Sequence, residues 1–326
     1  MNVTVLTGLE NDDPKSYDVV VDQVAAALRK NKHRASIFGV HDDLRKLVTG
    51  LGRRKADLIF NLVESFGDNI VGDVAVAGVL DLLRLRYTGG GPGELYLPQD
   101  KGLAKKVFAF EGILYPHFAV FSQDSDFETA GSLRMPLFVK PLTADASIGI
   151  DGDSLVRDTT SLMKRVLAIH EKVGDSALVE EYIEGREFYV GILGNREPVA
   201  FPPIEMDFSG LPEGVPRILG SKAKWKESSV EYKGTKSVLA DIPDDLRAKL
   251  QKAAVDAYRA LRVRDYGRVD LRLTETGEVY VIEVNASCYL EENSEFAMAA
   301  RAAGVEFPDL VQKIVELALE RYGNGR

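Results

Sequence analysis

Apolar residues near the start of the chain alternate between strand-like and helical spacing. A strand-like run at residues 3–6 precedes a helical stripe formed by Tyr17, Val20, Val21, Val24, Ala25 and Leu28. Asp13 is the expected N-cap of this helix, since Pro14 would then stand in its first turn. Short strands at residues 35–38 and 57–62 and an amphipathic helix at 71–82 follow. Such alternation favours an open parallel sheet with right-handed crossovers.

The alternation stops at a glycine-rich segment, Gly89-Gly90-Gly91-Pro92-Gly93, where we place the first domain boundary. We expect an N-terminal domain at residues 1–92, a central domain at 93–184 and a C-terminal domain at 185–326. The central domain is predicted to contain helices at 103–110 and 161–171 and strands at 118–121, 137–140 and 177–182. The C-terminal domain is predicted to contain a strand at 187–193, a loop-like stretch at 202–234, a helix at 245–261, a hairpin at 266–284, and helices at 295–303 and 310–319.

The predicted hairpin gathers polar side chains on one face. Residues 268–273 and 279–285 both alternate, and Thr276-Gly277 between them suits a two-residue turn. That turn would place Asp270 opposite Glu283 and Arg268 opposite Asn285. Two facing acids repel unless a cation lies between them, and Mg²⁺ prefers carboxylate and amide oxygens. The hairpin therefore predicts a divalent-metal site; the alternative is a solvated charged face.

Two further segments suit a bound nucleotide. Lys140 ends an apolar strand before Pro141, and residues 144–149 form a small-residue loop whose N–H groups could approach phosphate, although the P-loop ending is absent. The segment at 180–187 could offer backbone groups to adenine and a carboxylate to ribose; alternatively it is an exposed acidic linker.

Composition narrows the functional classes. The chain has 326 residues, 45% of them hydrophobic, and a net charge of −9, which disfavours a protein that grips nucleic acid or an anionic membrane. Cys288 is the only cysteine, so no internal disulfide can form, and we expect it to be incidental to the chemistry. No signal peptide or membrane-spanning run is apparent, so a cytoplasmic protein is expected.

Taken in order, these motifs resemble those of the ATP-grasp ligases, and within them the D-alanine–D-alanine ligase group. The resemblance extends from about residue 57 to the C-terminus. It is carried by Asn61-Leu62-Val63-Glu64, Tyr87-Thr88-Gly89, Asp100-Lys101, Phe138-Val139-Lys140-Pro141, Ser147-Ile148-Gly149, the segment Glu180 to Glu187, Gly267-Arg268-Val269-Asp270 and Ile282-Glu283-Val284-Asn285. It implies an α/β (α+β) three-domain ATP-grasp architecture, in which an N-terminal open parallel sheet precedes two α+β subdomains that clasp ATP.

The resemblance also implies roles for individual residues. Lys101 and Lys140 would bind the α- and β-phosphates, and Ser147 with the backbone to Gly149 would cover them. Lys224 would reach the γ-phosphate, with Lys222 and Lys226 as alternatives, and Arg268 would stabilise the acyl-phosphate stage. Adenine would meet the backbone of Glu180, Glu181 and Ile183, and ribose would meet Glu187. The metal ligands would be Asp270, Glu283 and Asn285, holding two Mg²⁺ (or Mn²⁺) ions. Substrate contacts are expected from Glu64, Arg268, Glu291 and Ser294.

The sequence departs from the family where the substrates bind. At residues 7–14 the acid that takes the first substrate's amine is not clearly placed. After Asn285 the family's small glycine-containing loop is replaced by a bulkier, acidic one at residues 286–296. Glu291 and Glu292 would disfavour an anionic carboxylate and favour a basic group; alternatively these acids begin a helix. Ser294 could still match the family serine that binds the second substrate's carboxylate.

These observations predict an ATP-dependent, ADP-forming carboxylate–amine ligase that acts through an acyl phosphate on an amino acid or small peptide, with the stretch 202–234 as a candidate lid. Alternatives are a true D-alanine–D-alanine or depsipeptide ligase, an ATP-grasp kinase, and a non-catalytic nucleotide-binding module. The expected partner is a small molecule, with no nucleic acid or membrane, and a homodimer is the candidate assembly of the chain.

Overall fold

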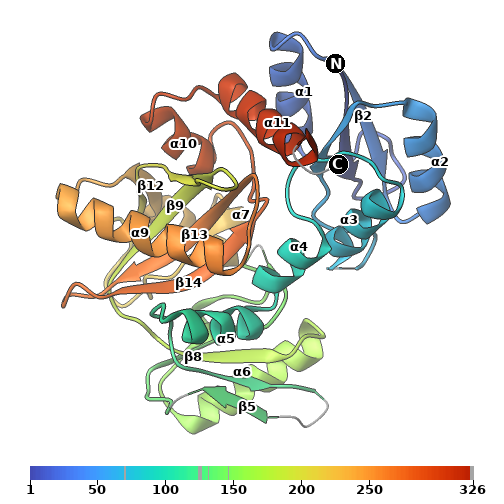
Figure 1. Ribbon diagram of the computed structural model, residues 1–326. Coiled ribbons are helices and arrows are strands. Elements are labelled where there is room, and N and C mark those ends of the chain that lie inside the picture. The colour runs from blue at the N-terminus through green and yellow to red at the C-terminus, as the bar shows by residue number, and fades with distance from the viewer. Residues whose placement is uncertain (70, 124–126, 131, 146, 324–326) are drawn as a thin grey trace.

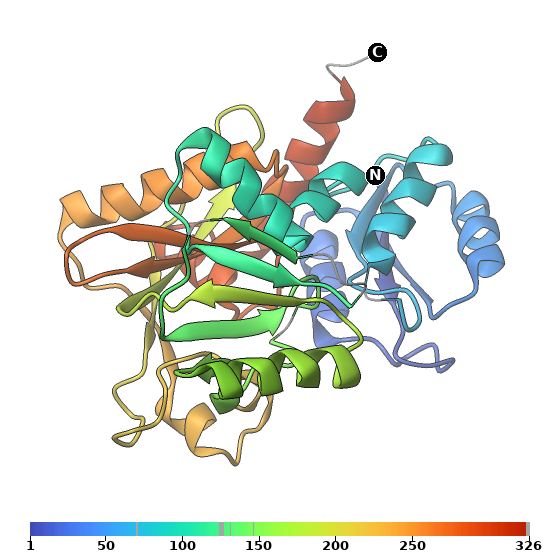
Figure 2. The same cartoon turned by 90° about the horizontal axis from the view of Figure 1, so that it is seen from below.

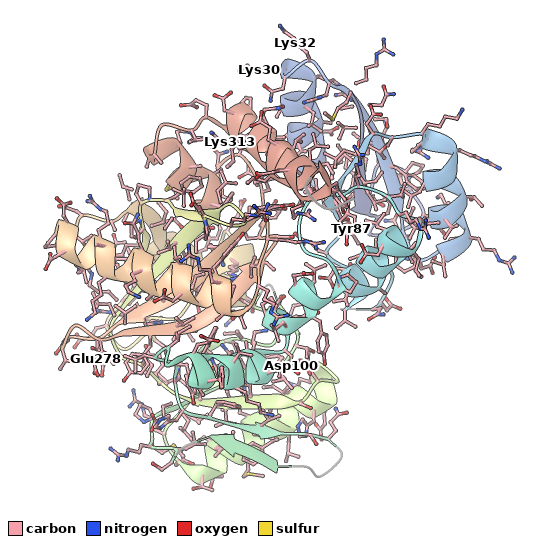
Figure 3. All side chains as sticks on the ribbon, in the orientation of Figure 1. Lys30, Lys32, Tyr87, Asp100, Glu278 and Lys313 are labelled. Atoms are coloured by element: carbon pink, nitrogen blue, oxygen red, sulfur yellow. The ribbon has the colours of Figure 1, made fainter. Side chains whose placement is uncertain are left out.

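The computed structural model describes residues 1–69, 71–123, 127–130, 132–145 and 147–323. Three β-sheets with their covering helices form three lobes around a central cleft (Figure 1). Figure 3 shows charged side chains such as Lys30, Lys32 and Lys313 pointing outward from the lobes, whereas Tyr87 is fully buried. In the described part of the chain, no helix is both long and apolar enough to cross a membrane.

The N-terminal lobe contains a parallel sheet, as predicted. Its strands are β1 (Asn2–Gly8), β2 (Arg34–Val40) and β3 (Leu58–Leu62) in the order β2-β1-β3. Its helices are α1 (Val19–Lys30), α2 (Leu44–Arg54), α3 (Gly72–Leu82) and α4 (Pro92–Gln99). The sequence did not predict α2, which buries only Leu47 and Leu51, too few residues for a clear stripe.

The predicted N-cap of α1 is wrong. The helix begins at Val19, and its cap is Asp18, whose carboxylate accepts from the backbone N–H of Val20. Asp13 instead organises a preceding turn, in which its side chain accepts from the N–H of Lys15 at 2.9 Å. A local turn at residues 11–16 therefore takes up the aspartate and proline that resembled a helix start.

The central lobe carries the antiparallel sheet β5-β4-β8-β6-β7. Its strands are β4 (Phe118–Phe121), β5 (Phe127–Ala130), β6 (Leu137–Pro141), β7 (Leu155–Val156) and β8 (Ala177–Glu181), and its helices are α5 (Lys101–Glu111), α6 (Thr159–Lys172) and the short 3₁₀ turn η1 (Gly152–Ser154). Helix α6 covers one face of this sheet (Figure 2). On that face β6 and β8 bury Leu137, Val139, Ala177 and Val179. Alternation along the strands therefore directs Lys140 and Glu180 to the opposite face, toward the cleft.

The C-terminal lobe contains the antiparallel sheet β12-β11-β9-β13-β14, with β10 paired to β9. Its strands are β9 (Arg186–Leu193), β10 (Val199–Ala200), β11 (Ile204–Asp207), β12 (Lys236–Leu239), β13 (Tyr266–Leu273) and β14 (Val279–Ala286), and its helices are α7 (Ser221–Trp225), α8 (Val230–Gly234), α9 (Asp244–Ala260), α10 (Glu295–Ala302) and α11 (Phe307–Gly323). The stretch 202–234, predicted to be loop-like, therefore contains β11, α7 and α8. These elements are short, so they left no periodic signal.

The β13–β14 hairpin has the predicted residue pairs at the end that lies in the cleft, but its register near the turn differs from the prediction. Asp270 lies opposite Glu283 and Arg268 opposite Asn285, whereas nearer the turn Leu273 pairs with Val279. The turn is one residue longer than predicted, and a β-bulge at Ile282 restores the register. The carbonyl of Ile282, freed from the ladder, accepts from the buried ammonium of Lys105 at 3.1 Å.

The last helix returns to the first lobe. Apolar residues of α11 and α1 share one core cluster, and Asn31 donates to the carbonyl of Pro308 at 2.7 Å. Near the other end of α11, the fully buried carboxylate of Asp265 accepts from Arg321 at 2.7 and 2.8 Å and from the N–H of Gly89 at 2.8 Å. Figure 1 shows α11 lying against α1, so the two ends of the chain pack together.

Candidate active site

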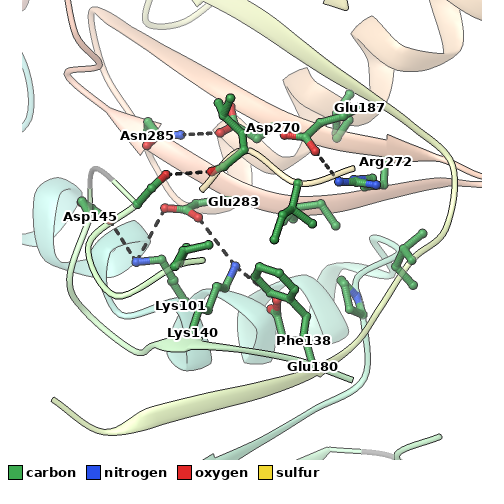
Figure 4. A pocket seen from close by; sticks show the side chains of 18 of the residues that line it. Lys101, Phe138, Lys140, Asp145, Glu180, Glu187, Asp270, Arg272, Glu283 and Asn285 are labelled. Atoms are coloured by element: carbon green, nitrogen blue, oxygen red, sulfur yellow. Dashed lines mark hydrogen bonds and ion pairs between the residues drawn. The ribbon is translucent and has the colours of Figure 1, made fainter. Parts of the chain in front are cut away.

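A cleft between the central and C-terminal sheets contains most of the predicted nucleotide residues. Its walls include Lys101, Lys140, Ser147, Glu180, Glu181, Ile183, Glu187, Lys224, Arg268, Asp270, Glu283 and Asn285. Figure 4 shows the side chains of Lys101, Lys140 and Glu283 converging from three different elements. The structure thus brings together residues that are as much as 184 positions apart, Lys101 and Asn285.

Six side chains form an alternating chain of charges along the cleft, and all of them except the exposed Asp145 are buried or partly buried. The ammonium of Lys101 lies 2.9 Å from Asp145 and 3.6 Å from Glu283. The ammonium of Lys140 lies 3.7 Å from Glu283 and 3.2 Å from Glu180. Lys105 completes the chain 2.7 Å from Glu180. Burial alone would raise the pKa of Glu283, but Lys101 and Lys140 lower it to about 2.

Lys105 and the carboxylate of Glu180 were not predicted to act together. Glu180 was expected to offer its backbone, yet its side chain is 2% exposed and is the counter-ion of two lysines. Burial alone would raise the pKa of Glu180, but Lys105 and Lys140 hold it below its ordinary value. The spacing of Lys101 and Lys105 on one helix face was the signal in the sequence that could have identified Lys105.

The adenine and ribose side is built from the β8–β9 connection. Glu181, Tyr182 and Ile183 line the cleft beside Phe138, whose ring centroid lies 6.4 Å from that of Tyr182. Glu187 accepts a hydrogen bond from the hydroxyl of Tyr189 at 2.9 Å and forms an ion pair with Arg272. Arg272 was not predicted; its guanidinium also donates to the carbonyl of Arg217 at 2.9 Å and thereby holds the segment before α7 against β13.

Two loops meet over the cleft. The hydroxyl of Ser147 donates to the carbonyl of Leu219 at 3.0 Å, and the backbone N–H of Ser221 donates to the carbonyl of Ile150 at 3.0 Å. Ser147 and Gly149 both have positive φ, 60° and 67°, which folds this loop tightly. Ala146, in the middle of the predicted phosphate loop, lies outside the described residues.

The predicted metal ligands lie together on one face of the hairpin. Arg268 forms a two-pronged pair with Asp270 at 2.7 and 2.9 Å, and the amide of Asn285 donates to Asp270 at 3.2 Å. No group of three or more His, Cys, Asp or Glu side chains suited to a metal occurs among the described residues; this set contains two acids and one amide. Two facing carboxylates and an amide oxygen fit a hard divalent cation, which would offset their repulsion.

Lys224 is distinguished from its two neighbouring lysines by position. It is partly buried and lines the cleft, whereas Lys222 and Lys226 are exposed and do not. Burial and the nearby charge of Arg268 lower the pKa of Lys224. The described residues form no ion pair with Lys224, whereas Arg268 is paired with Asp270; both cations line the cleft.

A second cavity of about 990 Å³ opens beside the first. The two share six wall residues, namely Asp145, Tyr189, Leu219, Lys224, Arg268 and Asn285. The predicted substrate residues Glu64, Arg268, Glu291 and Ser294 all line it, whereas Glu292 is exposed and does not. The hydroxyl of Ser294 caps α10 by accepting from the N–H of Ala297 at 3.4 Å. Glu295, in the first turn of α10, was not predicted as a site residue.

Comparison with known proteins gives a consistent result. A family model described as "D-ala D-ala ligase C-terminus" matches residues 99–316. A Sinorhizobium fredii protein designated y4sG is 32% identical over 94% of this chain and 89% of its own length. The D-alanine–D-alanine ligase of Desulforudis audaxviator is 32% identical over 91% of this chain and 92% of its own.

The fold is that of a solved ligase. The crystal structure of D-alanine–D-alanine ligase from Bacillus anthracis complexed with ATP covers 100% of both chains with a TM-score of 0.80 at 23% identity. This likeness confirms the predicted ATP-grasp architecture. The family model and the relatives, together with the site geometry, show that the chain belongs to the D-alanine–D-alanine ligase family of ATP-dependent C–N ligases.

Proposed function

We propose that this enzyme joins the carboxylate of an amino acid or small peptide to an amine through an acyl phosphate, with release of ADP and phosphate. The observation that carries the proposal is the wall shared by the two cavities. Lys224 and Arg268 lie in that wall, so a group bound in either cavity would meet the same two cations. A phosphoryl group passing from one cavity to the other needs such charge neutralisation.

The nucleotide would occupy the first cavity. Its adenine would lie against the apolar walls near Phe138 and Tyr182, with Glu187 close to the ribose. Lys101 and Lys140 would meet the α- and β-phosphates, and Ser147 with Gly149 would cover them. The hydrogen bond from the hydroxyl of Ser147 to the carbonyl of Leu219 joins the two loops over the cleft and would help to keep water from the reaction centre.

Asp270, Glu283 and Asn285 are the residues that would hold divalent cations, and we propose two ions, Mg²⁺ or Mn²⁺. Their contribution when bound is charge neutralisation on the phosphate oxygens. The residues of the chain position the reactants: Lys224 faces the γ-phosphate, and Arg268 faces the oxygen that becomes negative when the amine attacks.

The reaction has two balanced steps. A carboxylate oxygen of the first substrate attacks the γ-phosphorus, the bond to the β–γ bridging oxygen breaks, and ADP leaves. The neutral amine of the second substrate then attacks the acyl carbon, inorganic phosphate leaves, and the amine nitrogen loses one proton. No covalent enzyme intermediate is required, which agrees with a site built of lysines, arginine and acids.

The test is a screen for ATP turnover. The protein is incubated with Mg-ATP and pools of D- and L-amino acids and dipeptides while ADP and free phosphate are measured. Equal release of ADP and phosphate with a coupled product supports the proposal. A phosphorylated product without free phosphate would indicate a kinase. Binding of ATP without turnover in any pool would indicate a nucleotide-binding module, and conversion of D-alanine alone would assign the family's named reaction.

A further inference from the structure

The second cavity is strongly acidic on the side away from the nucleotide. Apart from the six shared residues, its described wall contains six carboxylates and no lysine or arginine. These acids come from three parts of the chain: Asp18, Glu64 and Asp73 from the N-terminal lobe, Glu227 from the segment after α7, and Glu291 and Glu295 from the loop and helix after β14. Together with the shared Asp145 they outnumber the two cations of the described wall, Lys224 and Arg268, so a ligand bound there meets a predominantly negative field.

The arginine that could offset this field is already neutralised. Arg268 is held by Asp270 at 2.7 and 2.9 Å, and its guanidinium also lies 3.6 Å from Glu295. Glu295 is itself fixed, because its other oxygen accepts from the hydroxyl of Ser237 at 2.9 Å. Glu295 therefore stands where a substrate carboxylate could otherwise pair with Arg268.

The hydroxyl of Ser294, the other candidate partner for a substrate carboxylate, caps α10. Among the described wall residues, Lys224 is then the cation left for an anionic end of the amine substrate, and the proposed reaction assigns it to the γ-phosphate.

Glu64 is one of the acids that a cation in this cavity would stabilise. It projects into the cavity, and no described residue forms an ion pair or hydrogen bond with its carboxylate. Its neighbours Asp18, Asp73 and Asp145 are also acids, so a positive ligand group would relieve the mutual repulsion. By contrast Glu291 and Asp18 already have partners, Gln23 at 3.0 Å and Tyr289 at 2.8 Å.

We propose that the amine substrate carries two amino groups, as a diamine or a basic amino acid does, and that its second ammonium is held by the acids around Glu64 and Glu295. This proposal rests on the ligase function above. One amino group loses a proton, attacks the acyl carbon and displaces phosphate, while the other stays protonated and is not consumed. Glu64 and Glu295 are specificity residues in this scheme.

The experiment separates activation from coupling. The enzyme is incubated with Mg-ATP and, in turn, each amino acid or dipeptide of the turnover screen as the carboxylate substrate. Hydroxylamine traps the acyl phosphate as a hydroxamate and so reports the first step alone. Coupling is then compared between amines matched in length, 1,4-diaminobutane against butylamine and lysine against norleucine. The member of each pair with two amino groups is expected to show kcat/KM at least about tenfold higher.

One outcome would overturn this inference and leave the ligase function standing. In that outcome hydroxamate forms, but butylamine and norleucine are coupled with the same kcat/KM as their partners with two amino groups. Absence of both hydroxamate and ADP with every carboxylate would overturn the two together.

Two variants test which residues cause the preference for an amine with two amino groups. Glu64→Gln keeps the side-chain shape and is expected to reduce the ratio of kcat/KM between the two-amine and one-amine members of each pair by about tenfold. The matched control is Glu292→Gln, an exposed acid of the same loop outside the cavity, which should leave the ratio unchanged. Equal ratios in wild type and Glu64→Gln would overturn the assignment of Glu64.

Glu295→Gln should free Arg268 from one of its two carboxylates. An acceptor with its own carboxylate, norleucine, should then improve relative to butylamine. An unchanged norleucine-to-butylamine ratio would overturn the role assigned to Glu295.

Discussion

Replacing Glu180 by glutamine tests whether the buried charge chain stabilises the cleft. Glu180 is 2% exposed and is the counter-ion of both Lys105, at 2.7 Å, and Lys140, at 3.2 Å. Glutamine has nearly the same shape but no charge. Glu180→Gln therefore leaves three buried lysines, including Lys101, facing two carboxylates.

The magnitude follows from these distances. At an effective dielectric constant of about 20, the two contacts give gross attractions of about 6 and 5 kcal/mol. Desolvation of the carboxylate offsets much of this sum, and breaking a buried pair from one side typically costs about 3–5 kcal/mol. We expect Glu180→Gln to lower the free energy of unfolding by about 3–5 kcal/mol, a large part of the total for a protein.

The assay is urea denaturation followed by circular dichroism, with linear extrapolation to water. The control is Glu184→Gln in the same connection, because Glu184 is exposed and should change stability by less than about 0.5 kcal/mol. The double variant Glu180→Gln with Lys105→Met removes the lysine that lost its partner. It should be about 1–3 kcal/mol more stable than the sum of the single changes predicts.

The pH dependence has a definite sign. The pKa of Glu180 is lowered in the folded protein, so its contribution is present above the ordinary glutamate pKa of 4.5 and is lost as the pH falls below it. The difference in the free energy of unfolding between wild type and Glu180→Gln should thus become smaller as the pH falls below 4.5. A loss no greater than that of Glu184→Gln at neutral pH would refute the reasoning.

Three other predictions can be measured directly. A Cβ on Gly185, where φ is 149°, would lie 1.9 Å from the carbonyl oxygen of Leu273. Gly185→Ala should therefore lower the free energy of unfolding, measured in urea, by more than about 2 kcal/mol. The control is Gly112→Ala, where φ is 68° and no atom is near, and it should lose about 1 kcal/mol. Burial raises the pKa of Cys288 from 9.0 to about 12, so its labelling by iodoacetamide at pH 8 should be roughly a thousandfold slower than in urea; equal rates would contradict this. Lys224→Met should abolish ADP formation while ATP still binds, whereas the exposed controls Lys222→Met and Lys226→Met should retain activity.

The sequence predicted the longer strands and the facing pairs of the hairpin because both depend on local periodicity, whereas the roles expected of the site residues came from the family resemblance. The hairpin pair Asp270 and Glu283 was placed correctly, although the turn length was wrong by one residue. The compensating bulge at Ile282 could not be seen locally, since its free carbonyl is satisfied by Lys105, 177 positions away in the chain. Lys140 and Glu180 meet only because β6 pairs with β8, and this pairing is not contained in either segment alone.

The sequence did not predict residues whose role depends on contacts between distant elements. Glu295 begins a helix, as acids commonly do, and only the packing of α10 against β9 brings it near Arg268. Arg272 lies on a predicted strand, yet its link to Glu187 requires β13 to pair with β9. Local sequence patterns do not contain these juxtapositions.

The contact between α1 and α11 has a consequence for how the protein is made. Helix α1 is complete once Lys30 has been synthesised, but its apolar partner α11 ends at Gly323, almost 300 residues later. At about 5–20 residues per second, the growing chain exposes that side of α1 for about 15–60 s. The N-terminal lobe should thus be a client of ribosome-associated chaperones until the final helix emerges, and a chain that stops before residue 307 should leave it prone to aggregate.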